Sequence, residues 1–150
     1  MSEQQPCRVA LLGLMLESNS FAPVTTEEDY VNRVYLAGDE ILKAFVALVS
    51  RNIRQSDLLA RYGGDEFAII LPEAGPDAAL KFCEKLRAMV EAHDFQFQGQ
   101  AIEVTTSVGL QSYEHTDGGK TVRQLVAAAD AHLYEAKKSG RNRICTGRFT

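Results

Sequence analysis

Apolar residues along this chain follow two spacings, one typical of strands and one typical of helices. Residues 9–16 are almost continuously apolar, a pattern that indicates a strand buried on both faces, and we expect this strand to be central in a sheet. The apolar runs 58–60 and 68–71 flank a Gly-Gly pair and predict a tight hairpin, because glycine accepts the positive φ values of hairpin turns. Extended runs at 95–97 and 102–110 predict a second antiparallel pair.

Three segments repeat their apolar residues at the spacing of a helix face. The first follows Gly38 and continues to Ile53, and the second starts at Pro76, a residue favoured at the first helical position. The third ends at Gly140, after which the stretch 142–145 predicts a last strand.

Between the first strand and the first helix, residues 17–26 are polar and turn-rich and predict a loop, and residues 29–36 fit either a short helix or an irregular crossover. The order of strand, helix, hairpin, helix, hairpin and helix predicts an α+β fold, with helices packed against a mostly antiparallel sheet. At 150 residues the chain can bury one sizeable core but not two, so we expect a single domain over residues 1–150.

Charge and cysteine usage limit the partners and compartments that fit the chain. The formal net charge of -4 disfavours a nucleic-acid partner, because domains that bind nucleic acid carry a basic face. The cysteines Cys7, Cys83 and Cys145 lack the spacing of zinc ligands, so we expect unpaired thiols in a reducing compartment, with Cys83 in the core. No apolar run reaches membrane-spanning length and residues 9–16 lack the flanks of a signal peptide, so we expect a cytoplasmic protein without a membrane partner.

Candidate chemistry gathers at the predicted hairpin, where Gly63 and Gly64 are followed by Asp65 and Glu66. Two adjacent carboxylates can hold a hard cation through their oxygens, while a phosphate approaches the N–H groups of a backbone that carries no side chains. A solvent-exposed hairpin tip without further function is the alternative.

Two further polar motifs accompany the hairpin. Arg-Gln-Ser-Asp at 54–57 comes shortly before it, and Lys-Lys-Ser-Gly-Arg at 137–141 closes the last predicted helix. Lys137 and Arg141 are one helical turn apart, which places both cations on one face, where they can bind phosphate. A solvated helix end favoured by the macrodipole is the alternative.

With these three motifs in this order, residues 38–146 resemble the GGDEF family of diguanylate cyclase domains. The resemblance implies a palm-type fold similar to that of nucleotide cyclases. It also implies a signalling enzyme, a nucleotidyltransferase that condenses two GTP molecules, one on each subunit of a transient antiparallel homodimer, to cyclic di-GMP and pyrophosphate. Such a reaction needs a divalent metal, Mg²⁺ or Mn²⁺, to neutralise the triphosphate and activate the attacking ribose 3′-hydroxyl.

The resemblance implies a role for each motif residue. Asp65 would ligate the metal, and Glu66 would be a catalytic or second acidic group. Asp39 matches the family aspartate that accepts hydrogen bonds from guanine, and it also fits a helix N-cap or a first-turn acid. The residues implied for substrate binding are Asp39, Gly63, Gly64, Lys137 and Arg141.

Arg54 and Asp57 match the family's inhibitory product site, in which arginine grips the phosphate and guanine of cyclic di-GMP. The offset of this motif from the hairpin favours the product site. An ordinary surface pair of arginine and aspartate is the alternative.

The first strand departs from the family pattern. GGDEF domains carry an Asp-Ile-Asp-x-Phe-Lys segment there, which supplies the second metal carboxylate. The best local match, at 16–21, places Glu17 at the metal position and Ala22 where the lysine belongs. Residues 8–42 instead resemble the N-terminus of microcystinase-C-like metallopeptidases, which suggests a chimeric or recombined chain with an atypical first strand and crossover over residues 8–37.

Three functions follow from these patterns. An active diguanylate cyclase would use Glu17 as a substitute metal ligand. A catalytically degraded domain would bind GTP or cyclic di-GMP without turnover. A metallopeptidase fragment ranks last, because one strand and loop cannot make a zinc site without further ligands.

Overall fold

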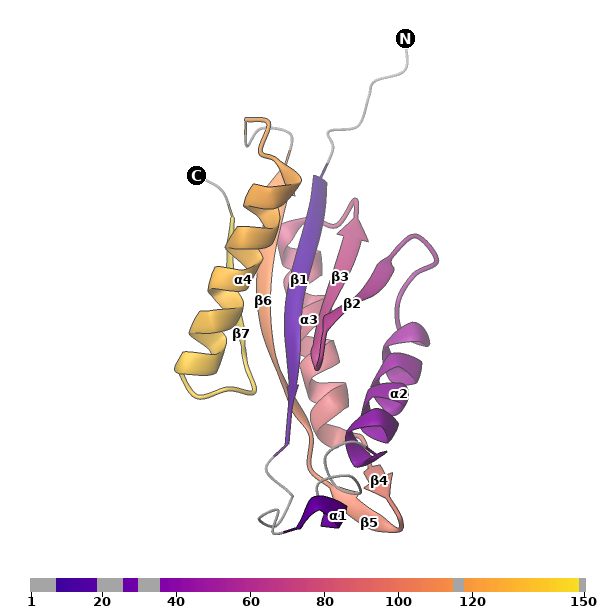
Figure 1. The fold of residues 1–150 in the computed structure, drawn as a ribbon. Helices are drawn as coiled ribbons and strands as arrows, with labels where there is room; N and C mark the ends of the chain where they lie inside the picture. The colour runs from indigo at the N-terminus through magenta and orange to yellow at the C-terminus, as the bar shows by residue number, and fades with distance from the viewer. Residues whose placement is uncertain (1–7, 19–25, 30–35, 115–117, 149–150) are drawn as a thin grey trace.

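A computed structural model describes residues 8–18, 26–29, 36–114 and 118–148 of the chain (Figure 1). The elements in these ranges are β1 (Arg8–Glu17), α1 (Glu27–Asp29), α2 (Ala37–Ser50), β2 (Leu58–Gly63), β3 (Glu66–Pro72), α3 (Pro76–Ala92), β4 (Phe95–Phe97), β5 (Gln100–Ile102), β6 (Thr105–Glu114), α4 (Val122–Lys138) and β7 (Ile144–Arg148).

β1 is the central strand of a five-stranded sheet, which confirms the prediction made from its apolar run. The strand order is β2-β3-β1-β6-β7. β1 pairs antiparallel with both β3 and β6, β2 pairs antiparallel with β3, and β6 pairs parallel with β7. The sheet is therefore mostly antiparallel and the fold is α+β, as predicted, while β4 and β5 form a separate two-stranded hairpin.

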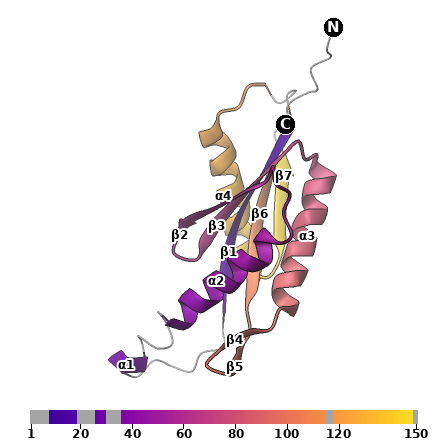
Figure 2. The same cartoon turned by 90° about the vertical axis from the view of Figure 1, so that its right-hand side faces the viewer.

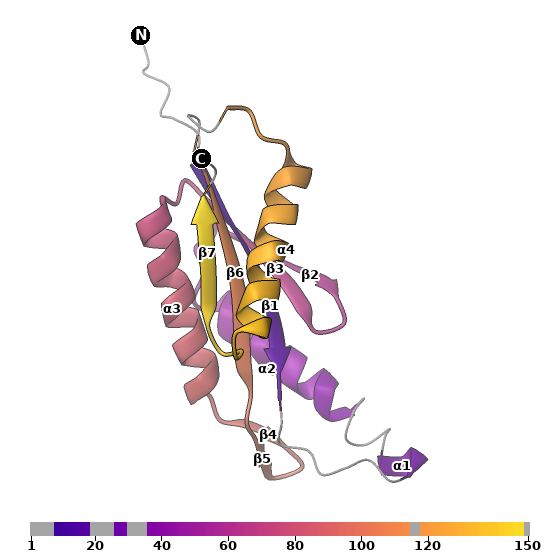
Figure 3. The same cartoon turned by 90° about the vertical axis from the view of Figure 1, so that its left-hand side faces the viewer.

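The helices cover both faces of the sheet, with α4 on one side and α3 on the other (Figures 2 and 3). The main core lies between the sheet and the helices α2 and α3. Alternate residues of β1 are buried in it, namely Ala10, Leu12, Leu14 and Leu16. Phe45 of α2 packs on Phe67 of β3 with ring centroids 4.8 Å apart. Cys83 of α3 lies in this core as expected, and its burial raises the pKa of the thiol.

The helix boundaries follow from local sequence signals. α3 starts with Pro76, as predicted. α4 starts with a capping box in which the Thr121 hydroxyl accepts from the Gln124 N–H while the Gln124 side chain accepts from the Thr121 N–H. α4 ends two residues before Gly140, whose φ of 127° favours glycine. Among the described residues, no helix is both long enough and apolar enough to cross a membrane.

α4 approaches the sheet most closely at Gly109 of β6. A Cβ at this position would collide with the backbone of Ala129 and of Leu133, so the contact requires glycine. This close packing fixes the position of α4 over β1 and β6. It thereby decides where the last turn of the helix, which carries Lys137, comes to lie.

Two strand predictions need correction. The predicted second antiparallel pair forms where Phe95 pairs with Ile102, but the run predicted at 102–110 divides in two, because Ile102 ends the β4–β5 hairpin and β6 starts only at Thr105. β6 then pairs with β1 and β7 rather than with residues 95–97. The last strand starts at Ile144 rather than at 142, because the preceding Asn142 has a φ of 47°, which is left-handed and incompatible with a strand.

The segment between β1 and α2 is described only in part. Glu27–Asp29 forms the single turn α1. Residues 19–25 of the predicted loop and residues 30–35 of the predicted helix or crossover lie outside the described residues.

Candidate active site at the end of the sheet

The tip of the β2–β3 hairpin lies beside the end of β1. β1 and β3 pair as far as Met15 and Glu66, and the Leu16 N–H then donates to the Asp65 carbonyl oxygen at 3.2 Å. This bond extends the ladder into the hairpin turn. Glu17, the next residue of β1, is therefore at the same end of the sheet as Asp65 and Glu66. The predicted hairpin and its acidic tip are confirmed.

The hairpin turn leaves open space next to its backbone. Gly64 has a φ of 48°, and beyond the immediate chain neighbours no atom of the described residues lies within 4 Å of a Cβ built on Gly63 or Gly64. Arg61 holds the turn, because its Nε donates to the Gly64 carbonyl oxygen at 2.9 Å. A phosphate group therefore has room to approach the backbone here.

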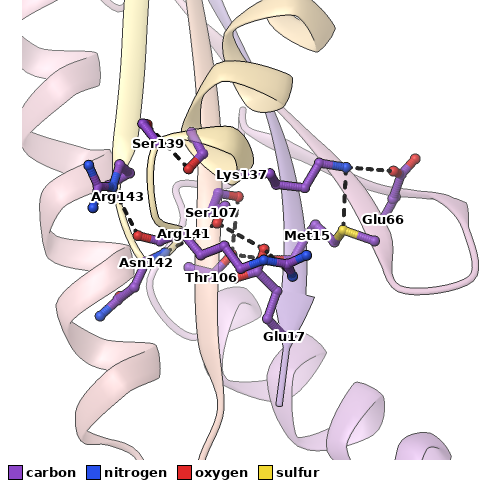
Figure 4. A network of polar contacts seen from close by, with 11 residues as sticks. Met15, Glu17, Glu66, Thr106, Ser107, Lys137, Ser139, Arg141, Asn142 and Arg143 are labelled. Atoms are coloured by element: carbon purple, nitrogen blue, oxygen red, sulfur yellow. Dashed lines mark hydrogen bonds and ion pairs between the residues drawn. The ribbon is translucent and has the colours of Figure 1, made fainter. Parts of the chain in front are cut away.

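Lys137 reaches from the last turn of α4 to the hairpin (Figure 4). Its Nζ lies 3.9 Å from Glu66 Oε1 and 3.5 Å from Met15 Sδ. Both charged side chains are partly exposed, so this ion pair contributes little stability. An anionic ligand can replace Glu66 as the partner of Lys137. Glu66 also lines a groove between the hairpin and α4, together with Tyr62 and Val126.

Glu17 is the most buried acid at this end of the sheet, with a side chain only 7% exposed. Its Oε1 accepts a hydrogen bond from the Ser107 hydroxyl at 2.9 Å and lies 3.3 Å from Arg141 Nη1. Its Oε2 is buried and has no hydrogen-bond partner among the described residues. Leaving a buried carboxylate oxygen unpaired is unfavourable, so this atom is suited to bind a cation.

Arg141 reaches the site from outside the helix, which corrects the predicted spacing. α4 ends at Lys138, and Arg141 follows Gly140 in a left-handed conformation with a φ of 63°. The helix cannot continue through Gly140, because that glycine has a φ of 127°. The two cations therefore do not share a helix face, yet both come to the same end of the sheet, where Lys137 pairs with Glu66 and Arg141 with Glu17.

Asp39 lies on the first turn of α2, which agrees with its interpretation as a first-turn acid. It does not cap the helix, because the N-cap residue is Leu36. Its described ion pair is with Lys43, whose Nζ is 3.1 Å away, and this hydrogen bond raises the pKa of Lys43. Its role in binding guanine stays a prediction.

Arg54 and Asp57 form a close pair between α2 and β2. The Arg54 backbone N–H donates to Asp57 Oδ2 at 2.8 Å, and Arg54 Nη2 donates to Asp57 Oδ1 at 2.9 Å and to the Pro72 carbonyl oxygen at 2.9 Å. The hydrogen bond to Asp57 raises the pKa of Arg54. The guanidinium remains half-exposed and is held in a fixed orientation, which is compatible both with the product site and with a surface ion pair.

Two site residues were missed by sequence reasoning, Ser107 and Asn142. Ser107 is a fully buried residue of β6, and Asn142 directly follows Arg141. Polarity alone does not single out Ser107, because it follows two threonines in the run 102–110. Its contact with Glu17 depends on the pairing of Met15 with Ser107, which only the folded sheet reveals.

The donor set fits a hard divalent cation such as Mg²⁺ or Mn²⁺. Such cations prefer carboxylate oxygens and keep several waters. Glu17 offers a buried free oxygen, and the hairpin acids Asp65 and Glu66 lie at the same end of the sheet. Within the described ranges no three His, Cys, Asp or Glu side chains gather closely, so a cation here would complete its shell with water or substrate phosphate.

The family model described as "Diguanylate cyclase, GGDEF domain" matches residues 35–143. The diguanylate cyclase DgcP of Pseudomonas aeruginosa is 37% identical over 110 residues, which cover 73% of this chain and 16% of that protein. The response regulator PleD of Caulobacter vibrioides is 37% identical over 110 residues, covering 71% of this chain and 24% of that protein. The chain thus spans less than a third of the length of these relatives.

Solved structures of similar fold cover more of the chain than the family model. The GGDEF domain of DgcB from Caulobacter crescentus in complex with c-di-GMP has a TM-score of 0.77 at 22% identity, covering 93% of this chain and 78% of that one. The active GGEEF domain of a diguanylate cyclase from Vibrio cholerae has a TM-score of 0.73 at 25% identity, covering 95% and 85%. These comparisons give no support to a metallopeptidase origin of residues 8–42 or to a chimeric chain.

Proposed function

This chain belongs to the GGDEF family of diguanylate cyclases, and from that premise we propose that it condenses two molecules of GTP to cyclic di-GMP and two molecules of pyrophosphate. One observation carries the proposal. At the end of the sheet, a buried carboxylate with a free oxygen lies beside an open glycine turn and two cationic side chains.

We assign Glu17 and Asp65 to a divalent metal, Mg²⁺ or Mn²⁺. Glu17 would contribute its free Oε2, Asp65 would supply a second protein oxygen, and water and substrate phosphate would complete the shell. When bound, the metal neutralises the triphosphate and activates the ribose 3′-hydroxyl. Glu17 occupies the position at which the family carries an aspartate, and its longer side chain can offer the same kind of oxygen.

The remaining residues bind and orient the substrate. Lys137 and Arg141 exchange their carboxylate partners for the terminal phosphates, while the open backbone at Gly63 and Gly64 lets the triphosphate approach. Asp39 accepts hydrogen bonds from guanine.

In each half of the reaction, the 3′-oxygen of one GTP bonds to the α-phosphorus of the other. The bond from that phosphorus to the β-phosphate oxygen breaks, and pyrophosphate leaves. The hydroxyl proton passes to a nearby carboxylate, a role we assign to Glu66.

The stoichiometry of the reaction requires two copies of the site. One domain holds one GTP, so a transient homodimer with facing sites would bring the two nucleotides together. GTP is a cytoplasmic substrate, and we place the domain in that compartment, without a membrane or nucleic-acid partner. The pair Arg54 and Asp57 would bind the product cyclic di-GMP and thereby regulate the enzyme.

Purified chain incubated with GTP and Mg²⁺ should form cyclic di-GMP, detected by mass spectrometry. Glu17→Gln and Asp65→Asn should each abolish most of the product, because each removes a carboxylate from the metal. Glu84→Gln serves as the matched control, since Glu84 is an exposed acid of α3, and it should leave the rate unchanged.

Product formation that persists in both site variants would refute the metal assignment. If wild-type chain forms no product but binds GTP or cyclic di-GMP in a calorimetric titration, the catalytically degraded binding module is the correct function. Stoichiometric zinc in the purified protein would instead favour the hypothesis of a metallopeptidase fragment.

A further inference from the structure

Two hydrogen bonds connect Glu17 to the turn that follows α4. They run from Glu17 Oε1 through the Ser107 hydroxyl of β6 to the backbone N–H of Asn142, which donates to Ser107 Oγ at 3.2 Å. Figure 4 shows Glu17, Ser107, Asn142 and Arg141 side by side at this end of the sheet. The proposed function uses only two of these residues, Glu17 and Arg141.

The two contacts of Ser107 fix the direction of its hydroxyl. A backbone N–H can only donate, so Ser107 Oγ must accept from Asn142. The single hydroxyl hydrogen is then free to donate to Glu17 Oε1 at 2.9 Å. Ser107 is fully buried, so bulk water does not compete for this hydrogen. Oε1 is thereby occupied, and Oε2 is the oxygen left without a partner.

Asn142 is held in place by two residues of α3. Its Oδ1 accepts from Arg87 Nη1 at 3.2 Å, and its Nδ2 donates to Glu91 Oε2 at 2.9 Å. Arg87 Nη1 and Glu91 Oε2 also pair with each other at 2.6 Å, which closes a triangle. The hydrogen bonds from Asn142 and then from Arg87 lower the pKa of Glu91, so its carboxylate stays ionised to lower pH than an isolated glutamate would.

The backbone at this point needs such support. Arg141 and Asn142 are consecutive residues with φ values of 63° and 47°, a left-handed conformation that asparagine tolerates better than most residues. The Asn142 side chain anchors this turn to α3, and the turn presents both the Asn142 N–H and the Arg141 guanidinium to the ends of β6 and β1.

We infer that Ser107 and Asn142 are positioning residues for the Glu17 carboxylate. The Asn142 N–H orients the Ser107 hydroxyl, and that hydroxyl holds Oε1 so that Oε2 faces the cation. The inference rests on the assignment of Glu17 to the metal in the proposed function. Residues that hydrogen-bond to a metal ligand typically change metal affinity by about 10–100-fold when they are removed.

The test is a titration of the purified chain with Mn²⁺, in which electron paramagnetic resonance measures the concentration of free Mn²⁺. Ser107→Ala should weaken Mn²⁺ binding about tenfold. Ser112→Ala is the matched control, because Ser112 is a second buried serine of β6 whose hydroxyl has no partner in the described ranges, and this variant should bind Mn²⁺ like the wild type. In a Glu17→Gln background, Ser107→Ala should cause no further loss, since the serine acts only through Glu17.

Asn142→Asp provides a second, independent variant. It keeps the shape of the side chain but places an oxygen where Nδ2 donates to Glu91, so it should release the turn and weaken Mn²⁺ binding. In the double variant Asn142→Asp/Glu91→Gln, the new glutamine can donate its amide hydrogen to the new aspartate oxygen. The double variant should therefore recover most of the lost Mn²⁺ affinity. Thermal unfolding of each variant confirms that the fold is retained.

Three outcomes would overturn the inference: Mn²⁺ binding to Ser107→Ala as tight as to wild type, an equal loss in the Glu17→Gln background, or no Mn²⁺ binding by the wild type. Its failure is distinguishable from failure of the proposed function. If the wild type makes cyclic di-GMP while Ser107→Ala binds Mn²⁺ normally, the proposed function holds and the role of Ser107 is refuted. If the wild type makes no product but loses Mn²⁺ affinity in Ser107→Ala, the role of Ser107 holds and the proposed function fails.

Discussion

Glu17 and Asp57 both have buried side chains, but among the residues described only Asp57 has hydrogen-bond partners for both of its carboxylate oxygens. Asp57 has a side chain 2% exposed, and both of its oxygens accept hydrogen bonds from Arg54. Glu17 is 7% exposed, and within the part of the chain that the structure describes its partners contact Oε1 alone. Because an unpaired buried carboxylate oxygen is unfavourable, Asp57 is complete without a ligand whereas Glu17 is not. This difference locates the candidate metal site at the end of β1.

Arg54 should bind cyclic di-GMP through the planar shape of its guanidinium. Asp57 and Pro72 engage Nε and Nη2, and the half-exposed group can present its remaining edge to phosphate or guanine. Lysine cannot copy this geometry, so Arg54→Lys should weaken binding nearly as much as Arg54→Ala, by about 1.5–3 kcal/mol in a calorimetric titration. Binding that survives both Arg54→Ala and Asp57→Ala unchanged would show that the two residues form only a surface ion pair.

The sequence predicted the helices and strands that are specified by residues close together in the chain. The hairpin is specified by two apolar runs around Gly63 and Gly64, and the continuous apolar run of β1 predicted its central place. The division of 102–110 between β5 and β6 was not predicted, because both parts are extended and only their different partners separate them. The prediction that Arg141 lies on the last helix was wrong. Its spacing from Lys137 suits a helix, but α4 ends at Lys138 and Gly140 has a φ that a helix does not allow.

The seating of α4 on the sheet depends on Gly109. A methyl group there meets the backbone of Ala129 and Leu133, which cannot move without displacing the helix. We expect Gly109→Ala to destabilise the fold by about 1–3 kcal/mol in chemical unfolding and to lower any cyclase activity by shifting Lys137.

Gly38→Ala is the control for this substitution. Gly38 lies within α2, and apart from its own helix backbone no atom of the described residues lies within 4 Å of an added Cβ, so the change should be neutral or stabilising by up to about 1 kcal/mol. Equal effects of the two substitutions would contradict the packing account of α4.

His132 makes the packing of α4 on β6 sensitive to pH. Its Nε2 lies 2.9 Å from Gln111 Oε1, and burial lowers its pKa from 6.5. A histidine pKa lowered in the folded state favours the neutral form there, so His132 contributes stability above the unfolded-state pKa that is lost as pH falls through the lower folded-state value. Between about pH 7 and pH 5, the unfolding temperature should therefore fall less in His132→Gln than in wild type. An identical fall in both would exclude this role.

At the scale of the whole molecule, the site joins residues that are far apart in the chain. Local sequence predicted the acids on a hairpin and Lys137 on a helix, while the resemblance to a family placed them in one site, and the structure brings Lys137 to Glu66. The contact between Ser107 and Glu17 could not be predicted, because it spans 90 residues and depends on the register of β1 against β6. The triangle of Arg87, Glu91 and Asn142 likewise depends on how α3 packs beside the turn after α4.

Crystals of the chain grown with Mn²⁺ and 3′-deoxy-GTP, which lacks the attacking hydroxyl, would show whether Glu17 binds the metal. Anomalous scattering locates the metal independently of any activity. We predict a Mn²⁺ ion about 2.0–2.6 Å from Glu17 Oε2, the range of oxygen distances for hard divalent cations, with the nucleotide phosphates beside Lys137 and Arg141. A Mn²⁺ ion bound only to the nucleotide, with Glu17 Oε2 still unliganded, would contradict the account.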